Sequence, residues 1–266
     1  MNMKGRRGFT VIELMIALSI SAIMLTSALT VFNGRKSSTE FTQGVYDLQS
    51  KVQNYATQVS SKVLPGYQQY TCAVSVATGR PVLTQASGGG ETTSENCIYL
   101  GQAFQVFQNG TLLYSYPVFG LRTYTDVNGN IQFPSTPATA KAEPALSSVD
   151  GSYLLADTYS LLNGLKIVSA TVGATESDFL TIYSSLSSNN TSGNQIAVSA
   201  APKTFSASDV SADTLKSCIE GQSCSPIPLN TTTWKLCITN GVKNAQLSVK
   251  AASTGISTSL ITDGCP

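Results

Sequence analysis

The chain has no histidine and few charged residues. Asp, Glu, Lys and Arg together make up 12% of its 266 residues, and the formal net charge is +1. Without histidine, the Ser-His and Cys-His pairs of nucleophilic catalysis and most zinc sites are excluded. No cluster of carboxylates or lysines stands out to replace them, so we expect no enzyme, no metal and no cofactor. The near-neutral charge also predicts no nucleic-acid groove.

Closely paired cysteines are also lacking, because none of the six lies in a C-x-x-C pair. The six residues are Cys72, Cys97, Cys218, Cys224, Cys237 and Cys265. Thiolate metal sites usually show closer pairing, so the even count favours disulfides in an oxidising compartment. Six cysteines allow 15 connectivities. Proximity along the chain favours the pairs Cys72–Cys97, Cys218–Cys224 and Cys237–Cys265.

One long apolar run lies near the N-terminus. Residues 9–32 contain a single ionisable side chain, Glu13. As a helix the run is about 36 Å long, enough to cross a bilayer. The charges that precede it are all basic, and the positive-inside tendency therefore keeps the N-terminus cytoplasmic and exports the rest. These basic residues are Lys4, Arg6 and Arg7.

Two plainer interpretations share these features. A secretory signal would be cleaved near the small residues Thr26–Ala28, and a signal anchor would stay uncut. The run is longer than a typical signal core, and neither interpretation gives Glu13 a purpose.

Gly8, Phe9 and Glu13 carry a resemblance to a known family. The stretch Gly8-Phe9-Thr10-Val11-Ile12-Glu13 follows a short basic leader, residues 1–8, and opens an unbroken apolar helix. It resembles the cleavage and methylation motif of type IV prepilins, and the resemblance covers about residues 1–65. It implies that a prepilin peptidase/methyltransferase cuts between Gly8 and Phe9 and methylates the new Phe9 amine.

The resemblance also gives Glu13 a role in filament assembly. A carboxylate near the bilayer edge is costly alone, and the Phe9 amine of the same or a neighbouring subunit would neutralise it. In the uncut chain we predict no partner for Glu13. The implied partners are other pilin subunits through the apolar helix, a membrane assembly platform, and lipid before assembly.

The implied location is a bacterial or archaeal-type cell envelope. The chain would cross the cytoplasmic membrane once, with an extracytoplasmic head, and then enter a pilus or pseudopilus at the cell surface. The large head favours a minor pilin or a pseudopilin of a type II secretion-like system. The alternative is an uncleaved, signal-anchored extracellular binding protein, adhesin-like and not a filament subunit.

The helix is predicted to continue beyond the apolar run, from Thr10 to Val63 within segment 9–65. Apolar residues recur at steps of three and four and form one stripe. They are Phe41, Val45, Leu48, Val52, Tyr55, Val59 and Val63. Gly34 and Gly44 are predicted weak points, each costing about 1 kcal/mol relative to Ala.

The remainder predicts an antiparallel β-rich head with short helices, so the fold class is α+β. Asn109-Gly110 and Asn128-Gly129 predict hairpin turns. A faint calcium-loop pattern, Asp126, Asn128 and Asn130, coincides with the second turn, but we favour the turn.

The head is divided by a Pro/Ala-rich stretch at 134–145, which we interpret as a linker or long loop. A first β-rich part covers 66–133 and a second α/β part covers 146–266, ending in a β-meander. Short helices are predicted at 152–164, 175–190 and 208–221.

Overall fold

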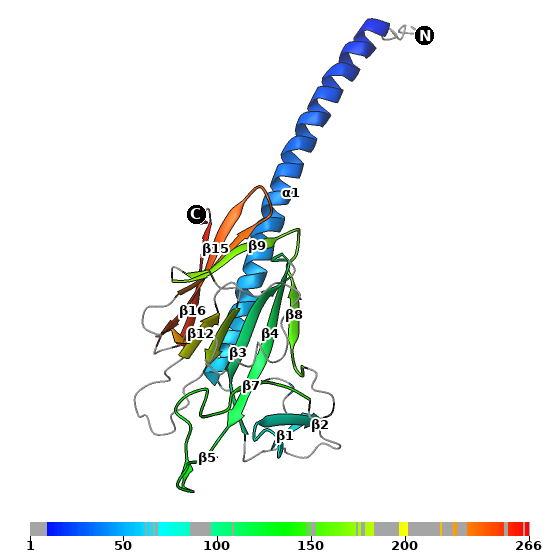
Figure 1. Ribbon diagram of the computed structural model, residues 1–266. Helices are drawn as coiled ribbons and strands as arrows, with labels where there is room; N and C mark the ends of the chain where they lie inside the picture. The colour runs from blue at the N-terminus through cyan, green and yellow to red at the C-terminus, as the bar shows by residue number, and fades with distance from the viewer. Residues whose placement is uncertain are drawn as a thin grey trace. The chain divides into compact units, whose positions relative to one another are not determined.

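The chain folds as one long helix followed by antiparallel strands, so the α+β class is confirmed (Figure 1). It divides into two compact units, Met1–Gln43 and Gly44–Pro266. The computed structural model describes residues 10–61, 63–64, 66, 69–85, 97–107, 109–147, 149, 153–173, 175–176, 179–183, 197–201, 219, 226–227, 233–252, 255–262 and 264–265.

Helix α1 covers Val11–Ser61, within two residues of the predicted bounds at each end. Its second part, in the larger unit, buries one apolar stripe as predicted. The buried residues are Val45, Leu48, Val52, Tyr55 and Val59. Val63 lies beyond the helix end and is 61% exposed, so the stripe ends one step earlier than the sequence suggested.

Gly44 is a packing residue of α1. A Cβ built on it would lie 2.5 Å from Leu165 Cδ1. Glycine has a low helix propensity, but its lack of a side chain leaves room for the buried Leu165 to pack against the helix backbone. Gly34 differs, because a Cβ there would meet nothing within 4 Å.

A seven-stranded sheet forms one side of the head. Its order is β13-β12-β11-β3-β4-β7, and β8 also pairs with β4. The bounds are β3 (Cys97–Phe107), β4 (Leu112–Leu121), β7 (Glu143–Pro144), β8 (Asp157–Ser160), β11 (Phe179–Tyr183), β12 (Ala197–Ala201) and β13 (Pro226–Ile227).

The hairpin between β3 and β4 turns at Asn109-Gly110, as predicted. Asn109 has φ 55° and Gly110 has φ 81°, the positive values that a tight two-residue turn requires. A Cβ on Gly110 would also collide with the backbone of Ile167, whose N–H donates to the Gly110 carbonyl at 2.9 Å. A glycine is therefore needed at position 110 for two reasons: the turn has a positive φ there, and the Ile167 backbone leaves no room for a Cβ.

A five-stranded sheet contains the predicted C-terminal meander. Its order is β10-β9-β14-β15-β16. The bounds are β9 (Lys166–Val172), β10 (Thr175–Glu176), β14 (Thr233–Thr239), β15 (Asn244–Ala252) and β16 (Gly255–Thr262). Strands β14 and β15 are joined by a turn at Asn240-Gly241: Gly241 has φ 85°, and the Asn240 side chain accepts from the amides of Val242 and Lys243.

The described part of the head also contains two small hairpins. They are β1 (Tyr70–Val74) with β2 (Pro81–Gln85), and β5 (Tyr124–Thr125) with β6 (Ile131–Gln132). In the second, Asp126 Oδ1 accepts from the amides of Asn128 and Asn130 at 2.8 and 2.9 Å. The amide of Asn130 is the main influence that lowers the pKa of Asp126. This carboxylate therefore holds a hairpin turn, the interpretation favoured from the sequence.

Two of the predicted short helices are wrong. Segment 152–164 contains strand β8, and segment 175–190 contains β10 and β11. Strand β8 pairs with β4, and β11 lies between β3 and β12, so long-range pairing overrides local helix patterns. The third segment, 208–221, lies outside the described residues except for Ile219, which is helical and buried.

The Pro/Ala-rich segment 134–145 takes part in the seven-stranded sheet. It supplies strand β7, which pairs with β4. Its buried alanines, Ala140, Ala142 and Ala145, lie in the core. Glu143 is 3% exposed, and its carboxylate lies 3.5 Å from the guanidinium of Arg80. Arg80 directly precedes β2, so this ion pair joins the β1–β2 hairpin to the segment.

Two of the three predicted disulfides are present. Cys72–Cys97 joins β1 to β3, and Cys237–Cys265 joins β14 to the tail after β16. Such cross-links stabilise the fold mainly by restricting the unfolded chain. Cys218 and Cys224 lie outside the described residues.

The core of the larger unit is formed where α1 meets the inner faces of both sheets. The Phe104 ring lies 5.5 Å from that of Tyr55 on α1 and 6.0 Å from that of Trp234 on β14. Phe104 and Trp234 are almost fully buried. One aromatic cluster therefore joins the helix to both sheets.

Polar bonds to α1 add to this core at strand β8. Asp157 accepts from Lys51 Nζ at 2.7 Å and from the Tyr55 hydroxyl at 2.6 Å. Burial is the largest single influence and raises the pKa of Asp157, but the bonds from Lys51 and Tyr55 outweigh it and lower the pKa. The Tyr159 hydroxyl donates to Asp47 at 2.6 Å.

Strand β16 binds the same part of α1 through amide side chains. Gln49 Nε2 donates to Thr258 Oγ1 at 3.3 Å, and the Thr258 hydroxyl donates to Gln53 Oε1 at 3.0 Å. Both sheets therefore fix the second part of the helix in the head.

Candidate membrane and assembly site

The helix begins with a reciprocal pair of bonds between Thr10 and Glu13. Thr10 Oγ1 accepts from the Glu13 amide at 3.3 Å. Glu13 Oε2 accepts from the Thr10 amide at 3.0 Å and from its hydroxyl at 3.1 Å. This is a capping box, with Thr10 at the N-cap and Glu13 three residues on. Its carboxylate also lies at the positive end of the helix dipole.

The capping box corrects one prediction about Glu13. We expected no partner for this carboxylate in the uncut chain, yet Thr10 supplies two donors. The signal was present in the sequence as T-x-x-E at the start of the apolar run. Gly8 and Phe9, the predicted processing residues, lie outside the described residues.

The capping box leaves part of the carboxylate free. Its bonds use Oε2, and within the described residues Oε1 of Glu13 has no partner. A carboxylate has about four acceptor positions. Glu13 can therefore cap its own helix and accept a bond from a further donor.

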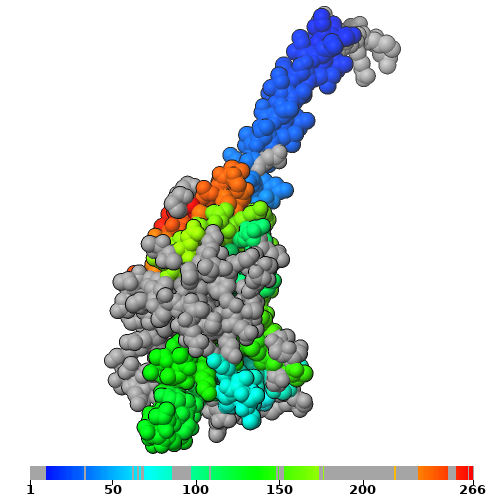
Figure 2. Space-filling model, viewed as in Figure 1, coloured from blue at the N-terminus to red at the C-terminus, as the bar shows by residue number. Residues whose placement is uncertain are grey.

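The surface of α1 from Val11 to Phe32 is apolar and exposed. Val11 is 76% exposed and Phe32 is 71% exposed, and the large apolar side chains between them are exposed to similar extents. Figure 2 draws this segment in blue. A continuous apolar surface of this size is unusual for a protein in water and indicates contact with lipid or with other apolar helices.

By length and hydropathy, α1 can cross a membrane. It contains an 18-residue window of mean hydropathy 2.1, and among the described residues it is the one helix that meets this criterion. The preceding basic residues, Lys4, Arg6 and Arg7, lie outside the described part of the chain. The first charged residues after the apolar segment are Arg35 and Lys36. Lys36 Nζ lies 3.8 Å from Glu40 Oε1, one helical turn on.

Hydroxyl groups in the apolar segment are satisfied within the helix. Each donates to a backbone carbonyl three or four residues earlier, for example Ser19 to Met15 and Ser21 to Ala17, both at 2.8 Å. Thr26, Ser27 and Thr30 do the same. A hydrocarbon environment offers no partner for a hydroxyl, so these bonds remove the main obstacle to burying them in lipid.

Comparison with known proteins identifies one motif. Residues 3–29 match the family model described as the prokaryotic N-terminal methylation motif. The match covers Gly8, Phe9, Glu13 and most of the apolar run, and it ends before the head. Neither the curated proteins nor the solved structures gave a match.

Proposed function

From the type IV pilin/prepilin signature that residues 3–29 carry, we propose that this chain is a subunit of a type IV pilin-like filament. The large head makes it a minor pilin or a pseudopilin. The observation that carries the proposal is the joint presence of the motif, a capped Glu13 and an exposed apolar helix. Its role is structural, as in the family that the motif marks.

Processing comes first. A prepilin peptidase/methyltransferase cuts between Gly8 and Phe9 and methylates the Phe9 amine. The absence of a side chain at Gly8 leaves the scissile carbonyl open to the enzyme. The cut places a positive amine directly before Thr10, one residue from the start of the capping box.

Assembly then depends on Glu13. Thr10 holds the carboxylate through Oε2, and Oε1 accepts the Phe9 amine of a neighbouring subunit. An unpaired charge in apolar surroundings is costly, and pairing offsets that cost in one register of the helices. The exposed apolar segment leaves lipid and packs against the same segment of other subunits, driven by van der Waals contact.

The subunit crosses the cytoplasmic membrane once before assembly, with the head outside. The basic leader supports this orientation. The disulfides Cys72–Cys97 and Cys237–Cys265 support an oxidising location for the head. A membrane assembly platform would then draw the subunit into a pilus or pseudopilus.

Mass spectrometry of the mature N-terminus tests the proposal. The expected product begins with N-methylated Phe9, and Gly8→Val should leave the leader attached. A chain that keeps Met1 in the presence of the peptidase would contradict the proposal and favour the uncleaved, signal-anchored binding protein instead.

A further inference from the structure

A cavity of about 370 Å³ opens on the five-stranded sheet beside the disulfide Cys237–Cys265. In the strand register, Cys237 of β14 lies opposite Ser169 of β9 and Gln246 of β15. Opposed residues of antiparallel strands point to the same face. The preceding residue of β14, Leu236, is fully buried on the other face. The cavity therefore lies on the side of the sheet that faces away from the core.

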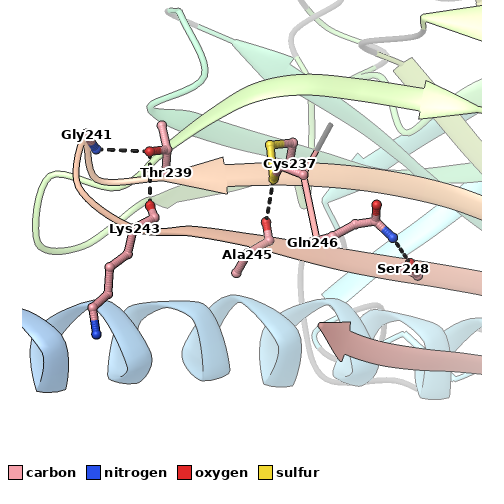
Figure 3. Close-up of a disulfide and its surroundings, with 8 residues drawn as sticks. Cys237, Thr239, Gly241, Lys243, Ala245, Gln246 and Ser248 are labelled. Carbon is pink, nitrogen blue, oxygen red and sulfur yellow. Dashed lines mark hydrogen bonds between the residues drawn. A yellow bond between two sulfur atoms is a disulfide. The ribbon is translucent and has the colours of Figure 1, made fainter. Parts of the chain in front are cut away.

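The cavity is lined by polar groups and one cation. Lys235 lies opposite Thr171, so the ammonium group and this hydroxyl share the cavity face with Ser169. Gln246 Nε2 donates to Ser248 Oγ at 3.1 Å, and Figure 3 shows the Gln246 side chain beside the disulfide. No carboxylate belongs to the described lining. Such a set suits a ligand with one negative charge and several hydroxyl groups.

Two more lysines extend the positive charge beyond the cavity. Lys166 lies opposite Thr239, about 13 Å along β14 from Lys235 at ~3.3 Å per residue. Lys250 lies opposite Thr233, two residues from Lys235 in the other direction.

The three lysines carry net positive charge across strands β9, β14 and β15. Within the described residues, none of Lys166, Lys235 and Lys250 forms an ion pair. On the described part of this face there is one acidic residue, Glu176 of β10, which lies opposite Thr171 of β9. The lysines therefore spread positive charge along the face, which suits an anionic polymer more than a small anion.

We propose that this face binds an acidic polysaccharide, with one carboxylate-bearing sugar seated in the cavity against Lys235. The hydroxyl and amide lining favours a sugar over a nucleic acid. Single-stranded nucleic-acid sites stack bases on aromatic side chains, and the described part of this face presents none. The site lies within the larger compact unit and does not depend on filament assembly.

The test uses the full chain in detergent micelles, so that binding is measured without assembly. The probe is polyglucuronate, with neutral dextran of equal length and a single-stranded oligonucleotide of equal charge as comparisons. Polyglucuronate should bind and dextran should not. Lys235→Gln should weaken binding about tenfold, the effect of losing one charged hydrogen bond.

Lys243→Gln is the matched control, because Lys243 lies at the turn after β14 and its side chain points away from the disulfide in Figure 3. It removes the same charge and should change the affinity less than about twofold. Thr171→Trp fills the cavity without changing charge and should weaken binding as much as Lys235→Gln. Equal losses at Lys235 and Lys243, equal binding of dextran, or tighter binding of the oligonucleotide would each overturn the proposal.

Discussion

Glu13→Gln separates two roles of one side chain. A glutamine keeps an amide oxygen for the Thr10 amide, and Gln is accepted at this position of a capping box. The helix start should therefore survive, while the negative charge is lost. If the charge pairs with a Phe9 amine in the filament, Glu13→Gln should insert into the membrane normally and fail to assemble.

The size of the assembly defect depends on the positive charge of the Phe9 amine, which Glu13→Gln leaves unpaired. Removing one partner of a buried ion pair costs about 3–5 kcal/mol, because the other charge is left unpaired. At 1.4 kcal/mol per tenfold, incorporation should fall at least about a hundredfold. Thr10→Val is the control: it removes the hydroxyl bonds and keeps the charge, at a cost of about 1 kcal/mol.

The assay compares the sheared filament fraction with the membrane fraction by immunoblot, for wild type and both variants. Mass spectrometry of each variant checks that the N-terminus is processed. Normal incorporation of Glu13→Gln would refute the charge pairing and leave Glu13 as a helix cap. A hundredfold loss in Thr10→Val would show instead that the cap governs assembly.

Two further predictions concern the stability of the head and helix. Gly44→Ala should lower the free energy of unfolding despite its better helix propensity, because the new methyl meets Leu165 at 2.5 Å; Gly34→Ala, with open space around it, should be neutral or stabilising by up to about 1 kcal/mol. Thermal unfolding of the full chain in detergent measures both, and equal effects would contradict this account of Gly44. Asp157→Asn should destabilise the head by about 1 kcal/mol, discounted for its partial exposure. Because the pKa of Asp157 is lowered in the fold, its contribution is present above the ordinary Asp pKa and is lost as pH falls below about 3.9 through the lowered value. The difference in thermal midpoint between wild type and Asp157→Asn should therefore shrink below that pH, and a constant difference would argue against it.

Prediction from the sequence succeeded where the determining contacts are local. The turn at 109–110 uses positive φ at both Asn109 and Gly110, the turn at 128–129 uses it at Gly129, and both hairpins formed there. It failed at 152–164 and 175–190, where strands β8 and β11 are selected by partners more than 40 residues away along the chain.

The sequence by itself determined the membrane-competent helix and its motif, because the apolar run and the Gly8-to-Glu13 spacing are properties of consecutive residues. Even the capping box is a four-residue pattern. The tertiary structure alone decided which distant residues share a surface. Lys166 on β9 lies far along the chain from Lys235 and Lys250 on the consecutive strands β14 and β15, and only the strand register brings the three to one face of the sheet. That register is fixed by burial of the opposite face against the core, which depends on the whole fold.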